Sequence, residues 1–130
     1  MRAYAGVTAQ EVSDFLSSGL LEVSDIYAPT PKFIAENGDL DEEEIEYTLS
    51  LLAAEDAIEL KSDQPGAACV LAFELPDSMI QEFHEISITV SSSILWEYVQ
   101  CLFEVSDDGE ELTWFATQEI SNNLSTWLAQ

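Results

Sequence analysis

The stretch that most constrains the fold is Ala67–Leu75, AACVLAFEL, which is almost continuously apolar and is bounded by Gly66 and Pro76. A short apolar run between turn-forming residues is typical of a β-strand that is covered on both faces. A strand with one face in water would instead alternate apolar and polar residues. We therefore expect Ala67–Leu75 to be a central strand of a sheet.

The segment Gly38–Leu60 predicts an acidic helix. Six carboxylates lie in its first turns, where the positive end of the helix dipole stabilises them, and Asp41 with Glu44 fits a capping box. Its apolar residues form two stripes, Ile45, Leu49, Leu52 and Ala53 on one side and Tyr47, Leu51, Ala54 and Ile58 on the other. A surface helix normally has one stripe. We expect either a central core helix or a helix whose second face meets a partner, which leaves homodimerisation open.

The first part of the chain carries recognisable start and stop signals. Arg2–Val7 predicts a strand. Thr8 followed by Glu11 predicts a capping box that begins a helix, and Gly19 predicts its end. Thr30-Pro31 predicts the start of a short helix that stops at Asn37-Gly38.

In the second half, apolar spacing decides the expectations. Pro76 opens a loop or short helix that holds Met79, Ile80 and Phe83, and the alternation over Ile86–Val90 predicts a half-exposed strand. The spacing over Leu95–Leu102 predicts a helix, with Phe103–Val105 as an alternative strand. After a turn at Ser106–Gly109, a last helix is expected over about Glu110–Leu128.

Length and order of elements give the expected fold class. A chain of 130 residues is one domain by length and is long enough to bury a core. Because strands and helices interleave, we expect a single α+β domain over residues 1–130, with a mixed sheet of about four strands flanked by helices.

The charge balance narrows the classes of partner. The chain has 26 Asp and Glu against 3 Lys and Arg, a net charge of -23, and its cations are Arg2, Lys32 and Lys61. Such a surface repels nucleic acid and anionic membrane, so neither is expected as a direct partner. The start of the chain lacks the apolar core of a secretory signal, and no apolar run reaches the length of a membrane span. Cys69 and Cys101 lie in apolar surroundings, which is typical of reduced thiols in a cytoplasmic protein.

Three interpretations of the charge compete. The chain could come from an acidic proteome or a salty cytoplasm, where the charge serves solubility. It could be a binding module for a basic protein, with the acidic helix as the contact. It could also be a nucleic-acid mimic, because duplex DNA carries about one charge per 1.7 Å and a helix rises about 1.5 Å per residue.

Sites for chemistry are poorly represented, and we expect no metal or cofactor. His84 is the only histidine and is expected in a loop, the two cysteines are far apart in sequence, and the phosphate-binding glycine pattern is absent. Glu119 falls on the apolar stripe of the last predicted helix, where a carboxylate must find a partner. We expect it to pair with Arg2 or to cap a neighbouring backbone. A small enzyme with a carboxylate site near Glu119 is the alternative of another class.

The sequence therefore favours a non-enzymatic module that binds a basic protein, and no catalytic residue is assigned. Trp114 and Gln118 are four residues apart on the last predicted helix, so they should touch and form an anchor beside Glu119. The candidate partner-binding residues are Asp39, Asp41, Glu42, Glu43, Glu44, Glu46, Trp114, Gln118 and Glu119.

The residues Trp114–Glu119, WFATQE, resemble the W-[YF]-A-T-Q-E signature near the end of a family of short actinobacterial proteins of unknown function. The opening Met1–Tyr4 and the stretch Pro31–Tyr47 are also similar to that family. The resemblance implies a cytoplasmic actinobacterial protein. It implies no activity, so no catalytic residues are carried over.

Overall fold

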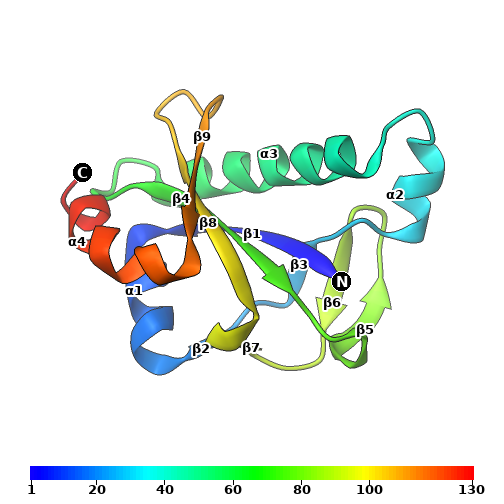
Figure 1. Cartoon of the computed structure of the whole chain (residues 1–130), viewed down its shortest axis with the longest axis horizontal. Helices are drawn as coiled ribbons and strands as arrows, with labels where there is room; N and C mark the ends of the chain where they lie inside the picture. The colour runs from blue at the N-terminus through cyan, green and yellow to red at the C-terminus, as the bar shows by residue number, and fades with distance from the viewer.

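The computed structural model describes all residues, 1–130, and Figure 1 shows its helices and strands. The strands and helices are β1 (Arg2–Thr8), α1 (Ala9–Ser18), β2 (Leu20–Leu21), β3 (Asp25–Tyr27), α2 (Pro31–Glu36), α3 (Glu42–Lys61), β4 (Ala68–Glu74), β5 (Ile80–Phe83), β6 (Ser87–Val90), β7 (Ile94–Leu95), β8 (Val99–Val105), β9 (Leu112–Ala116) and α4 (Ile120–Ala129). Three short 3₁₀ turns are η1 (Asp77–Met79), η2 (Trp96–Tyr98) and η3 (Thr117–Glu119).

The main sheet has seven strands in the order β5-β6-β3-β1-β4-β8-β9, and β2 pairs with β7 in a separate two-stranded sheet. Every pair of neighbouring strands in the main sheet is antiparallel. The single α+β domain is confirmed, but the prediction of a mixed sheet with about four strands is wrong. Short strands such as β3 and β5 hold too few residues to show a clear alternation in the sequence.

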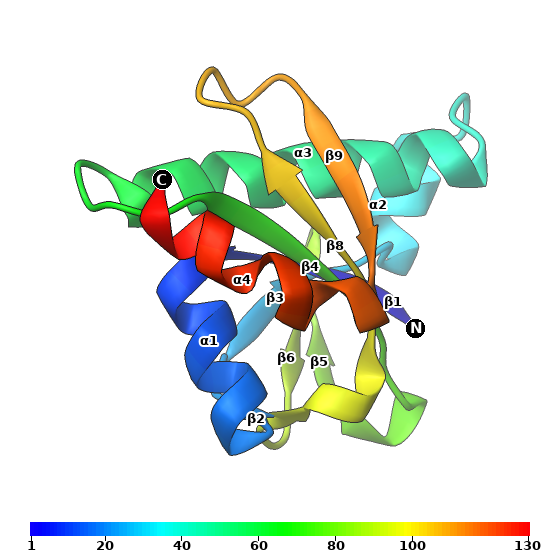
Figure 2. The same cartoon turned by 60° about the vertical axis from the view of Figure 1, so that its left-hand side comes forward.

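Strand β4 lies inside the sheet, between β1 and β8, as its sequence predicts. Its side chains alternate between two buried clusters, with Cys69, Leu71 and Phe73 in one and Ala68, Val70 and Ala72 in the other. Helices α1 and α4 cover the first face, and α3 with α2 covers the second (Figure 2). The continuous apolar run thus reflects a strand that is buried on both sides.

Small residues allow α3 to lie very close to the sheet. Ala53, Ala54 and Ala57 are fully buried on α3, and they face the side of β4 that carries alanines. A methyl group at Gly6 on β1 would overlap the backbone carbonyl oxygen of Ala53. The helix is therefore a core helix with one fully buried face. Of its second predicted stripe, Ala54 is buried in that same face, Leu51 and Ile58 are half-buried, and Tyr47 is exposed.

The predicted helix starts are confirmed by their hydrogen bonds. Thr8 and Asp41 each complete a capping box, with Glu11 and Glu44 respectively, and Thr30 caps α2. The Thr30 hydroxyl is buried and also donates to the Glu85 carbonyl oxygen over 2.6 Å, which ties α2 to the loop before β6.

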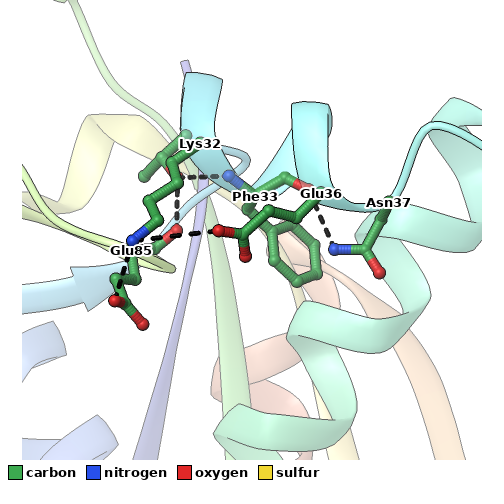
Figure 3. A network of polar contacts seen from close by, with 6 residues as sticks. Lys32, Phe33, Glu36, Asn37 and Glu85 are labelled. Atoms are coloured by element: carbon green, nitrogen blue, oxygen red, sulfur yellow. Dashed lines mark hydrogen bonds and ion pairs between the residues drawn. The ribbon is translucent and has the colours of Figure 1, made fainter.

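Charged side chains lie on the surface around the hydrogen bond between Thr30 and Glu85. Lys32 Nζ lies 2.9 Å from Glu85 Oε1 and 3.8 Å from Glu36 Oε1. Figure 3 shows both ion pairs. The Asn37 side chain donates back to the Phe33 carbonyl oxygen over 2.9 Å at the end of α2. One of the chain's few cations is therefore already engaged in ion pairs.

Two predicted helices are wrong over much of their length. The segment Leu95–Leu102 forms the end of β7, η2 and part of β8. The last predicted helix is divided into β9, η3 and the shorter α4. Strand β9 pairs with β8 across the turn at Ser106–Gly109, and this pairing overrides the helical spacing of its apolar residues. Similarly, Ile80–Phe83 is a strand, although the short helical turn before it is present.

Candidate functional site

The predicted acidic residues lie together at the start of α3. Asp39, Asp41, Glu42, Glu43 and Glu44 are exposed and Glu46 is half-buried. None of them forms an ion pair with a cationic group. We call these six residues the acidic start of α3. Its carboxylates therefore have no cationic partner within the chain.

Two of these carboxylates also have a structural role. Asp41 Oδ1 accepts from the Glu44 backbone N–H over 2.8 Å, and Glu44 Oε1 accepts from the Asp41 N–H over 3.2 Å. The helix N-terminus supplies further partial positive charge to the same place. The local fold therefore tolerates a density of negative charge that would be unfavourable in a helix interior.

A pocket of about 620 Å³ lies beside the acidic start of α3. Its charged lining residues are Arg2, Glu42, Glu46 and Glu74, and its apolar wall includes Leu40. Arg2 is half-buried, its Nε atom has no hydrogen-bond partner, and it forms no ion pair. The only arginine of the chain therefore has no ion-pair partner, although carboxylates line the same pocket.

The surroundings of Arg2 affect its pKa in opposite directions. Burial lowers the pKa of the guanidinium, whereas a hydrogen bond with Tyr4 and the charges of Tyr4, Cys101 and Glu46 raise it, and the net direction is upward. Burial also raises the pKa of Tyr4, to about 12, although the hydrogen bond with Arg2 acts against it. Arg2 therefore stays charged and Tyr4 stays neutral over the physiological range.

From Arg2, two further hollows of about 280 Å³ each follow α3 toward the β8–β9 hairpin. Arg2 and Glu46 line both the large pocket and the first hollow, and Tyr47 lines both hollows. The other walls come from the hairpin, through Phe103 and Leu112 in the first hollow and Gly109 and Glu110 in the second. We call this chain of hollows the α3–β9 groove. It joins the acidic start of α3 to apolar side chains.

Trp114 lies on β9 at the end of the sheet, 58% exposed, opposite Phe103 of β8. Gln118 and Glu119 follow in η3 and are also exposed. The prediction that Trp114 and Gln118 are helical neighbours is wrong, because β9 ends between them. What remains of the predicted anchor is a large exposed indole on an edge strand.

The environment of Glu119 differs from one of the two expectations and matches the other. It forms no ion pair with Arg2. Its Oε1 atom accepts from the Ala116 backbone N–H over 2.8 Å, so it caps a neighbouring backbone. Because α4 begins only at Ile120, Glu119 does not lie on an apolar helix face and lines neither the Arg2 pocket nor the α3–β9 groove.

A family model described as "Family of unknown function (DUF6912)" matches residues 1–108. The chain belongs to this family. No curated protein and no solved structure matches the chain. The match includes Met1–Tyr4 and Pro31–Tyr47 but ends before Trp114, so the C-terminal signature and the actinobacterial origin stay predictions.

The two cysteines of this DUF6912 chain lie apart in the fold. Cys69 and Cys101 are buried free thiols in different core clusters, on opposite faces of the sheet. Burial raises the pKa of Cys69 to about 12, and burial also raises that of Cys101, although Arg2 and a hydrogen bond from Trp114 act against it. No group of three His, Cys, Asp or Glu side chains is arranged to hold a metal ion.

His84 lies just after β5, outside any strand or helix, as predicted. Its Nε2 atom is 2.6 Å from the Thr89 hydroxyl, which donates to Asp25 Oδ1 over 2.7 Å. This exposed chain of polar groups connects β6 with β3 and the end of β5.

None of the helices combines the length and the apolarity that crossing a membrane requires.

Proposed function

We propose that this DUF6912 chain is a non-enzymatic binding module that docks a basic segment of a partner protein on the acidic start of α3 and the adjoining α3–β9 groove. The observation that carries the proposal is the exposed, unpaired state of this acidic patch directly beside a groove with apolar walls. In a chain with 26 acidic side chains against 3 cationic ones, no internal partner competes for most of these carboxylates.

Charge and apolar contact have different roles in this proposal. An exposed ion pair contributes only about 0.2–1 kcal/mol, so the carboxylates mainly attract the partner and accelerate its association. Apolar burial contributes about 25 cal/mol per Å², and aromatic side chains dominate many interfaces. Tyr47, 56% exposed on α3, lines the groove, and the exposed Trp114 lies on β9 opposite Phe103 of the groove wall. They are the proposed anchors.

The proposed compartment is the cytoplasm. Two cysteines that are buried and unpaired fit a reducing environment, because extracellular domains commonly use such residues in disulfides. A basic partner in the same compartment could be a nucleic-acid-binding protein. Mimicry of DNA by the acidic helix is therefore the narrower version of the same proposal.

Affinity capture from the native cytoplasm, washed at low and at high salt, tests the proposal. The test variant is Glu42→Gln/Glu43→Gln/Glu44→Gln, which retains the capping side chain at position 44 in amide form. The matched control is Glu22→Gln/Asp63→Asn/Glu97→Gln, which removes the same number of charges at exposed positions outside α3.

A basic protein retained by the wild type and the control, but lost from the α3 variant and at high salt, is the expected result. Equal retention by both variants, or binding unchanged by salt, would contradict the proposed site. Adding duplex DNA to the captured complex then separates the two versions. Release by DNA indicates mimicry, and retention indicates a partner that recognises the acidic surface in another way.

A further inference from the structure

Strand β9 is an unprotected edge of the main sheet. The strand is at the end of the sheet order, pairs with β8 over five residues without a register shift, and contains no charged residue or proline. Strand β5 at the other edge carries Glu82 and has a register irregularity between Ile80 and Glu82. Natural sheets blunt their edges with charges, prolines or bulges, because an open edge recruits further strands. The edge at β5 has such protection and the edge at β9 does not.

The hydrogen bonds around β9 define which of its backbone groups are free. Just before the strand, the Ser106 N–H donates to the Glu111 carbonyl oxygen over 2.9 Å, so position 111 bonds across the hairpin. Bonded positions alternate along an antiparallel pair, which places the N–H groups of Leu112, Trp114 and Ala116 on the side away from β8. Consistently, the Ala116 N–H is taken by the Glu119 carboxylate. The N–H groups of Leu112 and Trp114 have no such side-chain partner.

We infer that an extended, basic segment of the partner adds to the sheet as a strand along β9. This inference rests on the proposed function and assigns the backbone contacts that would accompany the acidic patch. Main-chain hydrogen bonds give such strand addition its affinity, and alternate side chains give it specificity. One face of the added strand would lie beside Trp114, which is exposed and has no neighbour on the open side of β9.

The charged residues beside β9 indicate what kind of segment binds there. Glu110 and Glu111 precede β9 and Glu119 follows it, and all three are exposed. A segment with an apolar centre and Lys or Arg at both ends therefore complements the edge in both polarity and charge. A second copy of this chain would bring its own net charge of -23 and similar carboxylates to the contact. Repulsion makes the second copy the poorer occupant.

The paired variants Trp114→Ala and Trp114→Pro test the inference. Both lose the indole, but only the proline lacks the outward N–H, and edge strands tolerate proline at such positions. The corresponding control on β5 is Phe83→Pro, where the neighbouring His84 N–H donates to the Ser87 carbonyl oxygen and so leaves position 83 facing outward. The probe is the synthetic peptide KRTVTVTRK, with its affinity measured at low salt.

The wild type and Phe83→Pro should bind the probe equally. Trp114→Pro should bind at least about fivefold more weakly than Trp114→Ala, because it loses one interstrand hydrogen bond and blocks the edge sterically. Circular dichroism verifies that each variant is folded. If Trp114→Pro is not folded, two N-methylated versions of the peptide are compared instead. One is methylated at every odd position and the other at every even position, so that only one of them has its methyl groups on the edge that faces β9. Only the peptide whose methyl groups face β9 should lose its binding to the wild type.

Equal binding by Trp114→Ala and Trp114→Pro, or by the two methylated peptides, would overturn strand addition and leave the acidic patch as the sole contact. Absence of any probe binding by the wild type would instead reject the proposed function together with the inference. The free wild type could also sediment as a dimer that the Trp114→Pro substitution dissociates. That result would overturn the inference, because a second copy of the chain would then occupy the β9 edge.

Discussion

Gly6 of β1 lies directly against the backbone of Ala53 on α3, with no space for a side chain between them. A Gly6→Ala substitution must therefore push α3 away from the sheet. Overpacking of this kind commonly costs about 1–3 kcal/mol, and contact with rigid backbone places this site at the upper end or beyond. Urea unfolding should show a loss of about 3 kcal/mol. Gly38→Ala is the control, because its nearest neighbour is 3.9 Å away, and it should leave the unfolding midpoint almost unchanged. Equal midpoints for the two variants would contradict this packing.

The cap of α3 can be separated from its charge. Asp41→Ala removes the acceptor for the Glu44 N–H and should lower the free energy of unfolding by about 1 kcal/mol. Asp41→Asn retains an acceptor and removes one negative charge, so its stability should equal or exceed that of the wild type. Thermal unfolding at low ionic strength distinguishes the two. A loss with Asn as large as that with Ala would show that charge rather than the hydrogen bond matters at this position.

Alkaline pH should destabilise the fold through Tyr4. Burial raises its pKa from 10.0 to about 12, so the folded state holds the phenolic proton more tightly than the unfolded state. The resulting stability is complete below about pH 10, the ordinary pKa, and is lost as the pH rises toward about 12. Urea midpoints measured from pH 9 upward should fall less steeply in Tyr4→Phe than in the wild type. The exposed Tyr47→Phe serves as a control and should follow the wild-type slope. Identical slopes in all three proteins would refute this role of Tyr4.

Both thiols should be inert in the folded protein. Cys69 and Cys101 are 0% and 2% exposed, and burial raises the pKa of each, so little reactive thiolate forms at neutral pH. A chromogenic disulfide reagent at pH 8 should label neither cysteine in buffer and both in urea. Their places in different clusters also predict that oxidation yields no internal disulfide. Rapid labelling of Cys101 alone would indicate that the β8–β9 hairpin opens beside Trp114.

Local signals in the sequence were sufficient for one half of the fold. Thr8 and Asp41 are followed by a glutamate three residues later, and a capping box depends on that spacing alone. The central strand was predictable because burial on both faces leaves a continuous apolar run. Strand β9 was not, because Leu112, Phe115 and Ala116 also fit a helical spacing, and only pairing with β8 decides between the two. The turn at Ser106–Gly109 lies between two apolar runs, and this pattern is the signal from which the hairpin could have been predicted.

The candidate site was predictable to a similar extent. Exposure of the acidic start of α3 follows from its charge density, since a cluster of carboxylates cannot be buried without partners. The α3–β9 groove could not be predicted. Its walls combine Tyr47 of α3 with Phe103 and Leu112 of the hairpin. These residues are far apart in the sequence and meet only through the tertiary fold.

The most direct test of the proposed binding to the acidic start of α3 is the salt dependence of the dissociation constant for the peptide KRTVTVTRK. We predict that affinity falls steadily as sodium chloride is raised, because screening weakens the ion pairs. Glu42→Gln/Glu43→Gln/Glu44→Gln should bind more weakly at low salt and with a shallower salt slope than Glu22→Gln/Asp63→Asn/Glu97→Gln. Equal affinities and slopes for these two variants would contradict the account, because the attraction would then belong to the net charge of the chain and not to this patch.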